Sequence, residues 1–246
     1  MQGATCSLSF ALSGRRTTVD ANLAVAQALR YAEELRQIHA GERAQRALAE
    51  RALTELKDSY GTTVRALAAV LELRDDQTGN HAQRVTSLAL DLTRRVEPEL
   101  EEPELEYGFL LHDLGKVGIR DGVLLKAGPL DDGEFEEMRF HTTLGERVVA
   151  GVPYLGGVAR EVIASHHERW DGSGYPKGLK GTEIPLPARI FSIIDAFDAM
   201  TNDRPYRKAR PVAEALAEIA RGAGTQFEAR LADAFILLVE ELRLAA

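Results

Sequence analysis

The chain has 246 residues, of which 45% are hydrophobic and 28% are charged, which is enough for one sizeable core or a core with an appended element. The formal net charge of −8 gives no global field that attracts a nucleic-acid backbone, so we expect no DNA partner. The single cysteine, Cys6, excludes a disulfide framework and a thiolate metal cluster and fits a reducing cytoplasm. No apolar run approaches the ~20 residues of a membrane span, so we expect no membrane-spanning segment.

The first part of the chain predicts a long helix. Residues 1–20 are interpreted as a loosely ordered tail, with a truncated upstream domain as the alternative. Residues 21–70 are dense in Ala, Leu, Glu, Arg and Gln, which are strong helix formers. We therefore expect one long helix there, or a helical hairpin with Gly41 or Gly61 as the break.

An apolar stripe in this segment is compatible with a coiled-coil seam. Its residues are spaced three or four apart and are Leu53, Leu56, Tyr60, Val64, Leu67 and Leu71. Such a stripe either packs on its own domain or pairs with a second copy of the chain. We favour the second interpretation, a homodimer through the N-terminal helix.

Residues 71–246 predict a compact helical bundle. Pro103 suits a first helical turn. Apolar residues recur at helical spacing in six further ranges, which are 82–96, 142–149, 158–164, 190–200, 212–220 and 231–242. No alternating stretch predicts a strand, and the longest non-helical signal is the Gly- and Pro-rich range 170–187. The expected fold class is all-α, with a long N-terminal helix or helical hairpin followed by this bundle.

The histidines carry the first signal of chemistry, because most of them stand in acidic or paired company. His112 is followed by Asp113, and His166 is followed by His167. Neighbours on a helix point about 100° apart, so two adjacent ligands can flank one metal ion or reach two. Imidazole and carboxylate donors without a thiolate suit Fe, Mn, Zn, Ni or Co. His39 lies in a polar stretch and is expected to be a surface residue.

Two charged residues predict the surroundings of such a site. Lys116 lies one helical turn after His112 and suits a phosphate oxygen, or else it is a solvated lysine at a helix end. Asp195 lies in an apolar range, where a carboxylate is costly unless it is paired or binds a metal. Asp198, three residues later, could face inward with it, and Arg189 is the alternative partner of Asp195.

A local island of positive charge lies near residue 205. The run Asp203-Arg204-Pro205-Tyr206-Arg207-Lys208 brings three cations within five residues of an acidic protein. Arginine binds phosphate through two parallel hydrogen bonds, so the island predicts a site for a small anionic ligand. An ordinary basic helix end is the alternative.

Together the ordered motifs resemble the HD-GYP family, a branch of the HD phosphohydrolase superfamily. The two motifs that give the family its name are His112-Asp113 and Gly174-Tyr175-Pro176, and the likeness runs from about residue 70 to about residue 240. The resemblance implies an HD-type helical bundle over 71–246. It also implies hydrolysis of cyclic di-GMP to linear pGpG or on to GMP.

The resemblance further implies which residues form the site. The implied metal ligands are His81, His112, Asp113, His141, His166, His167 and Asp195. Asp113, the implied bridging carboxylate, and Lys116 would be catalytic. Lys116, Tyr175, Arg204 and Arg207 would bind the substrate. Iron or manganese is the expected metal, with Zn, Ni or Co compatible. Some members carry an acidic residue four positions before the first histidine ligand, which supports a third metal; here Gln77 stands there, so we expect two divalent ions.

The expected reaction is hydrolysis at phosphorus. Two divalent ions would lower the pKa of a water toward ~7, and Lys116 would stabilise the developing negative charge. A catalytically weak cyclic-dinucleotide-binding signalling module and a phosphodiesterase for another cyclic dinucleotide are the alternatives. The sequence leaves open the metal, the preferred base, the final product and the signal that reaches the N-terminal helix.

Overall fold

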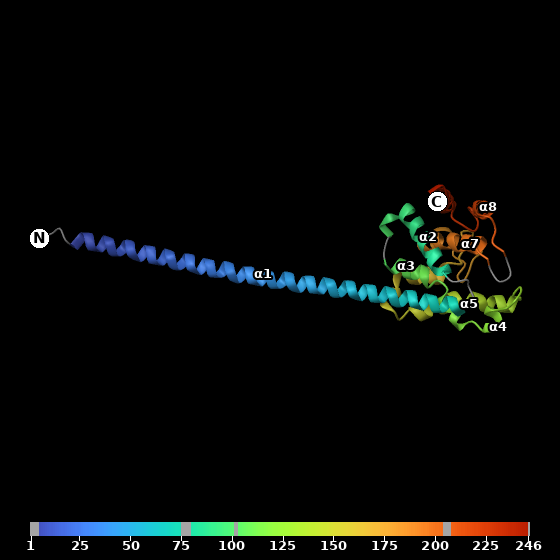
Figure 1. The fold of residues 1–246 in the computed structure, drawn as a ribbon, viewed down its shortest axis with the longest axis horizontal. Coiled ribbons are helices and arrows are strands. Elements are labelled where there is room, and N and C mark those ends of the chain that lie inside the picture. The colour runs from blue at the N-terminus through green and yellow to red at the C-terminus, as the bar shows by residue number, and fades with distance from the viewer. Residues whose placement is uncertain (1–4, 75–79, 101–102, 204–207, 246) are drawn as a thin grey trace. The chain divides into compact units, whose positions relative to one another are not determined.

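The computed structural model describes residues 5–74, 80–100, 103–203 and 208–245, with the side chains described from residue 22 to residue 244 of these ranges (Figure 1). The regular secondary structure of the described residues is helical, without a β-strand; Ala223 and Phe227 form an isolated bridge. The predicted all-α fold class is therefore confirmed. The chain divides into two compact units, Met1–Ser59 and Tyr60–Ala246.

The first unit is formed by α1, a single helix that runs Thr5–Arg74 and continues into the second unit. It passes Gly41 and Gly61 without a break, because an isolated glycine costs a helix interior only about 1 kcal/mol. Residues 5–20, where the sequence predicted a loosely ordered tail, belong to this helix, and no proline stops it there. None of the described helices combines the length and the apolar run that crossing a bilayer requires.

The second unit is a bundle of shorter helices. They are α2 His81–Val96, α3 Pro103–Leu110, α4 Asp121–Leu124, α5 Asp132–Val149, α6 Gly157–Ser165, α7 Leu186–Thr201, α8 Val212–Gly222 and α9 Ala229–Ala245, with the 3-10 turns η1 Pro98–Leu100, η2 Leu114–Gly118, η3 Pro153–Leu155 and η4 Gly181–Glu183. Each range that apolar spacing predicted as helical lies within one of these helices. Most of the Gly- and Pro-rich range 170–187 lies in the connection between α6 and α7, whereas residues 186 and 187 begin α7.

Two hydrophobic clusters support the bundle. The larger cluster gathers residues of α2, α7, α8 and α9 around aromatic side chains, including Phe109 and Phe191, whose rings stack at 5.1 Å. Phe191 also contacts the ring of His112 at 4.6 Å, so this cluster forms one wall of the site. The smaller cluster joins the end of α1 to α3 and α6.

The predicted coiled-coil stripe divides at about residue 60. Val64 is buried in the smaller cluster, and Tyr60 and Leu71 pack against it. Leu53 and Leu56, which precede this point, are exposed. The part of α1 from about residue 60 onward therefore packs largely on its own bundle, which was the alternative interpretation of the stripe.

Candidate metal centre

Seven histidine and aspartate side chains converge inside the second unit. They lie at the start of α2, after α3, within α5, after α6 and within α7, and are His81, His112, Asp113, His141, His166, His167 and Asp195. Their ligand atoms form two groups, Asp113 with His141, His166 and His167, and His81 with His112 and Asp195. Within each group these atoms lie within 4.8 Å of one another. The structure thus brings together all seven residues that the resemblance implied as ligands.

The spacing argument assumed that the adjacent pairs lie on helices, but in the structure both pairs lie just after a helix end. His112 and Asp113 follow the end of α3, where the chain tightens into the 3-10 turn η2, and His166 and His167 follow the end of α6. Helix C-termini commonly tighten in this way. The two members of the first pair consequently belong to different groups.

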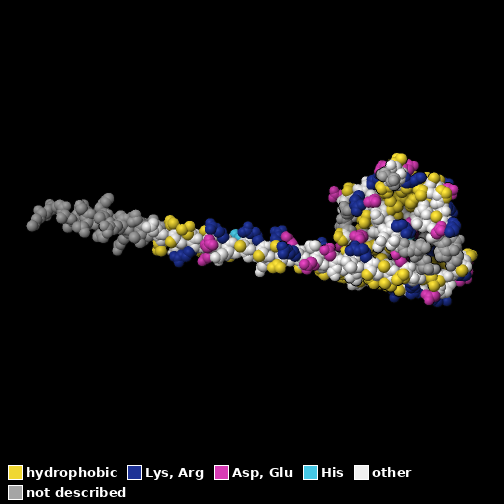
Figure 2. Space-filling model, in the orientation of Figure 1, with side chains coloured by type: hydrophobic (Ala, Val, Ile, Leu, Met, Phe, Trp, Pro, Cys, Tyr) yellow, Lys and Arg dark blue, Asp and Glu magenta, His cyan; other side chains and the backbone are white. Residues whose placement is uncertain are grey.

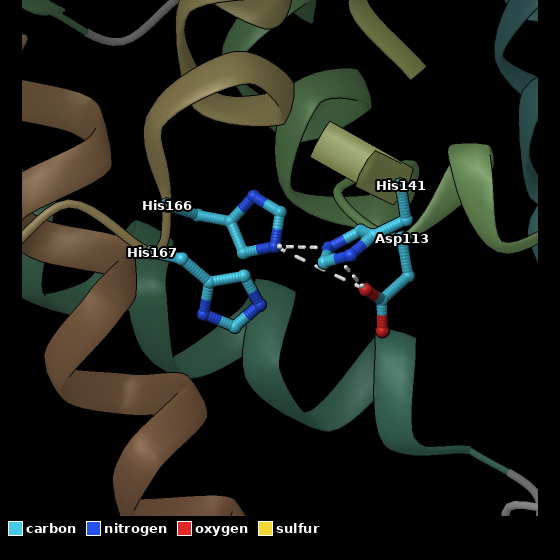
Figure 3. Close-up of side chains that lie close together, drawn as sticks. All are labelled: Asp113, His141, His166 and His167. Carbon is cyan, nitrogen blue, oxygen red and sulfur yellow. Dashed lines mark hydrogen bonds and ion pairs between the residues drawn. The ribbon is translucent and has the colours of Figure 1, made fainter. Parts of the chain in front are cut away.

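Asp113 faces both groups. Its Oδ1 atom lies 3.4 Å from His141 Nε2 and 3.9 Å from His166 Nε2, as Figure 3 shows for this group. Its Oδ2 atom lies 3.1 Å from His112 Nε2 and 2.8 Å from Lys116 Nζ. A single carboxylate therefore presents one oxygen to each group, which is the arrangement that a bridging ligand needs.

The backbone fixes the orientation of three imidazoles. A carbonyl oxygen accepts a hydrogen bond from the Nδ1 atom of each ring, which must therefore carry a proton. The three bonds are His112 to Phe109 at 2.8 Å, His141 to Met138 at 2.7 Å and His166 to Val162 at 3.1 Å. The Nε2 atoms are consequently directed into the site.

His81 is oriented by a carboxylate instead. Its Nδ1 atom lies 2.7 Å from Asp198 Oδ2, and its Nε2 atom lies 3.8 Å from Asp195 Oδ1. Asp198 also accepts hydrogen bonds from Arg84 and Asn202. Burial raises the pKa of Asp198, but the hydrogen bonds from His81 and Arg84 outweigh it and hold the pKa below its usual value. Asp198 therefore acts as an anionic support behind a candidate ligand, an arrangement common in metal sites.

The donor arrangement fits divalent ions. The Nε2 atoms of His141 and His166 lie 3.3 Å apart. Since the Nδ1 atoms carry the protons, two nitrogen lone pairs face each other here, and a cation between them would remove the repulsion. Imidazole and carboxylate donors with hydrogen-bonded supports behind them suit Fe, Mn, Zn, Ni or Co.

Protonation within the site follows from burial and from Asp113. Burial lowers the pKa of His141, that of His166 well below its usual range and that of His167 to about 4, so these rings are neutral at pH 7. Burial also acts to lower the pKa of His112, but the neighbouring Asp113 outweighs it and raises this pKa. Asp113 itself remains ionised, because Lys116 and His112 overcome its burial and hold its pKa well below the usual value.

A cavity of about 430 Å³ opens beside the two groups. Tyr175 lines it, with its ring stacked on His167 at 4.8 Å, and the guanidinium of Arg139 lies 4.7 Å from the centre of the Tyr175 ring. The Tyr175 loop is held by the buried carboxylate of Glu168, which accepts hydrogen bonds from two backbone amides of that loop at 2.7 and 3.0 Å. Gly174 is required there, since a Cβ atom would lie 2.3 Å from the backbone nitrogen of Arg169.

Sequence reasoning missed Glu168 and Arg139. Glu168 directly follows the histidine pair, but its burial cannot be read from a polar stretch, and Arg139 offers only its position two residues before His141. The alternative partner of Asp195 is excluded, because Arg189 pairs with Glu228.

Three further predictions cannot be compared with the fold. Arg204 and Arg207, expected to meet phosphate, and Gln77, expected to disfavour a third metal, lie outside the described residues.

Comparisons with known proteins identify the family. Residues 65–231 match the HD domain family. The chain is similar to a cyclic di-GMP phosphodiesterase of Thermotoga maritima, with 39% identity over 197 residues, 79% of this chain and 53% of that protein. It is also similar to a probable cyclic di-GMP phosphodiesterase of Vibrio cholerae, with 40% identity over 199 residues, 74% of this chain and 45% of that protein. The chain thus spans about half the length of these curated relatives.

A solved structure has the same fold. It is a crystal structure of cyclic GMP-AMP specific phosphodiesterases in V. cholerae, which aligns with a TM-score of 0.59 at 23% identity and covers 74% of this chain and 49% of that chain. The chain therefore belongs to the HD domain family, and its His-Asp and Gly-Tyr-Pro motifs place it in the HD-GYP branch.

Proposed function

We propose that the chain is a metal-dependent phosphodiesterase that hydrolyses cyclic di-GMP to pGpG, to GMP or to both. The observation that carries this proposal is the position of Asp113, whose two carboxylate oxygens face two separate groups of imidazoles. The Nζ atom of Lys116 lies 2.8 Å from one of these oxygens, Oδ2. The names of the two curated relatives support the substrate.

Each group would hold one divalent ion, iron or manganese by preference, with Zn, Ni or Co compatible. When bound, such ions activate water as a nucleophile and neutralise charge on a phosphoryl group. The neutral residue Gln77 supports two ions rather than three.

The remaining residues would bind and orient the substrate. Lys116 places a cation at the edge of the centre, where it would stabilise negative charge that develops on phosphoryl oxygens. Burial raises the pKa of Tyr175, so its hydroxyl keeps its proton at neutral pH and can donate to a phosphate oxygen. Arg204 and Arg207 would supply further phosphate contacts.

A cyclic GMP-AMP dinucleotide is the second candidate substrate. A curated V. cholerae relative that is 36% identical over 183 residues is named for specificity toward 3'3'-cGAMP. Initial rates measured side by side on the two dinucleotides decide between them, and the faster substrate at equal concentration identifies the preferred one.

The proposal is tested on anaerobically purified protein loaded with Mn(II) or Fe(II), with the products identified by chromatography. Asp113→Ala should abolish both metal loading and turnover, because it removes the ligand shared by the two groups. Lys116→Ala should retain both ions but lose about 100-fold in turnover, as expected when one charge-stabilising group is removed. Near-normal activity of Asp113→Ala, or loss of both ions from Lys116→Ala, would contradict the assignment.

We also propose that α1 forms a homodimer with a second copy. The side chains from Asn22 to Ser59 are exposed, apart from the partly covered Ala32. Hydrophobic side chains appear on the surface of this segment in Figure 2, and Leu29, Leu35 and Ile38 are more than half exposed. Long helices in proteins owe most of their stability to the packing of an apolar face, which a parallel or antiparallel partner helix would provide here.

A further inference from the structure

Helix α2 begins without a capping side chain of its own. Its N-cap residue, Asn80, has a φ of 83° in the left-handed region, and its side chain makes no capping hydrogen bond to the described first turn. The first backbone N–H groups of a helix need partners from outside the helix. His81 is the first residue of α2, so whatever satisfies these amides also sets the position of a candidate ligand.

The partner comes from the last turn of α1. The carboxylate of Glu72 accepts a hydrogen bond from Ala82 N at 2.5 Å through Oε1 and one from Asn80 N at 3.3 Å through Oε2. These two amides flank His81 in the sequence. A carboxylate at this place is also stabilised by the positive end of the α2 dipole.

The side chain of His81 is fixed at its other end by Asp198, at 2.7 Å from Nδ1. His81 is therefore held at two points. Glu72 holds the backbone on either side of it, and Asp198 holds the Nδ1 atom of its ring. Loss of the first point would loosen the opening turn of α2 and shift Nε2 relative to Asp195. The group of Asp113, His141, His166 and His167 contains no residue of α2 and should be unaffected.

We propose that Glu72 is a positioning residue for the metal group of His81, His112 and Asp195, acting through the backbone of α2. The inference rests on the proposed function, because it assumes that each group holds an ion. It makes α1 part of the active site without giving α1 a ligand.

The test is a calorimetric titration of metal-stripped full-length protein with Mn(II) alone. Wild type should bind two ions. Glu72→Gln removes the charge and turns one acceptor into a donor, so one ion should bind with unchanged affinity and the other about 10- to 100-fold more weakly, the usual loss when a supporting residue is removed. Hydrogen exchange of residues 80–86 should accelerate in this variant while α5 and α7 retain their protection.

The matched control is Glu106→Gln, because Glu106 also pairs with α1, through Arg65 at 3.1 Å, but lies on α3. It should bind both ions as wild type does. Two wild-type affinities in Glu72→Gln, or equal weakening of both sites, would overturn the inference and leave the proposed function standing. A wild type that binds fewer than two ions would overturn both. If Glu72→Gln does not fold, Glu72→Asp replaces it. This variant should lose less affinity for Mn(II), and at one site only. Equal losses of affinity at both sites would contradict the inference.

Discussion

His112 and His167 lie around the same carboxylate, yet their pKa values move in opposite directions. Burial dominates at His167 and favours the neutral ring, whereas His112 shares a short contact with Asp113 Oδ2 that favours the charged ring. In the metal-free protein, burial favours the neutral, coordinating form of His141, His166 and His167, whereas Asp113 favours the protonated ring of His112, with which an ion would compete.

The low pKa of His167 predicts how the metal-free protein responds to acid. Its folded-state value of about 4 lies below the ordinary value of about 6.5, so the unfolded chain binds more protons between these values. The contribution of the neutral His167 ring to the unfolding free energy is complete above about pH 6.5 and is lost as the pH falls toward 4. The unfolding free energy of wild type should fall between pH 7 and pH 5. In His167→Gln this fall should be smaller by on the order of 1–2 kcal/mol.

Urea unfolding of metal-stripped protein at the two pH values measures this difference. His39→Gln, on the exposed surface of α1, is the control and should follow wild type. Parallel losses in wild type and His167→Gln would mean that His167 does not titrate as its surroundings indicate.

The candidate ligands could be named from the sequence only through the resemblance to the HD-GYP family, because His81, His141 and Asp195 stand in no adjacent pair. The groups that hold these ligands in place could not be predicted. The backbone carbonyls that hold the rings have no side-chain signal, and Glu72 reaches Ala82 only because α1 ends beside the start of α2. A contact of this kind depends on tertiary packing, which residue spacing does not encode.

At the scale of elements, the contact between η2 and α5 determines how Asp113 and Lys116 meet His141. Gly115 allows this approach, since a Cβ atom there would lie 1.8 Å from the backbone oxygen of His141 and 2.6 Å from Gly145 N. The end of α1 is tied to the same turn, because Arg74 donates hydrogen bonds to the backbone oxygens of residues 117 and 119 at 2.7 and 2.8 Å.

Gly115→Ala should therefore separate η2 from α5. We expect a loss of about 1–3 kcal/mol of unfolding free energy, as for other overpacked cores, together with weaker metal binding. Gly122→Ala in α4 is the control, because its Cβ atom would have open space within 4 Å, and it should be neutral or slightly stabilising.

Thermal unfolding and metal content of the two variants test this contact. Equal stability and metal content in Gly115→Ala and wild type would show that the approach of η2 to α5 does not need glycine.

The helices themselves were largely predictable, because apolar spacing marks the face that each helix buries. The start of α1 was not predictable, because residues 5–20 lack a long apolar stripe and composition alone does not decide between a helix and a loosely ordered tail. The fate of the coiled-coil stripe was also undetermined, because spacing cannot tell whether a second copy or the chain's own bundle covers it.

At the scale of the whole molecule, the exposed face of α1 predicts self-association. Replacing Leu35 and Ile38 by Glu should convert a dimer to a monomer in sedimentation velocity, because charges would replace apolar contacts across the two helices. Leu237→Glu is the control: Leu237 is 51% exposed, as Leu35 is, but lies on α9. A wild type that remains monomeric across the concentration series would remove the basis of the dimer.

The ligands of the proposed centre span residues 81 to 195 and come from α2, α5, α7 and the turns after α3 and α6. Ion binding and folding of this unit would consequently be one linked equilibrium. Each ion present at a hundred times its dissociation constant would add about 2.7 kcal/mol to the unfolding free energy. A cell short of the metal would then hold an enzyme that is both idle and more readily degraded, so metal supply would control its lifetime as well as its turnover.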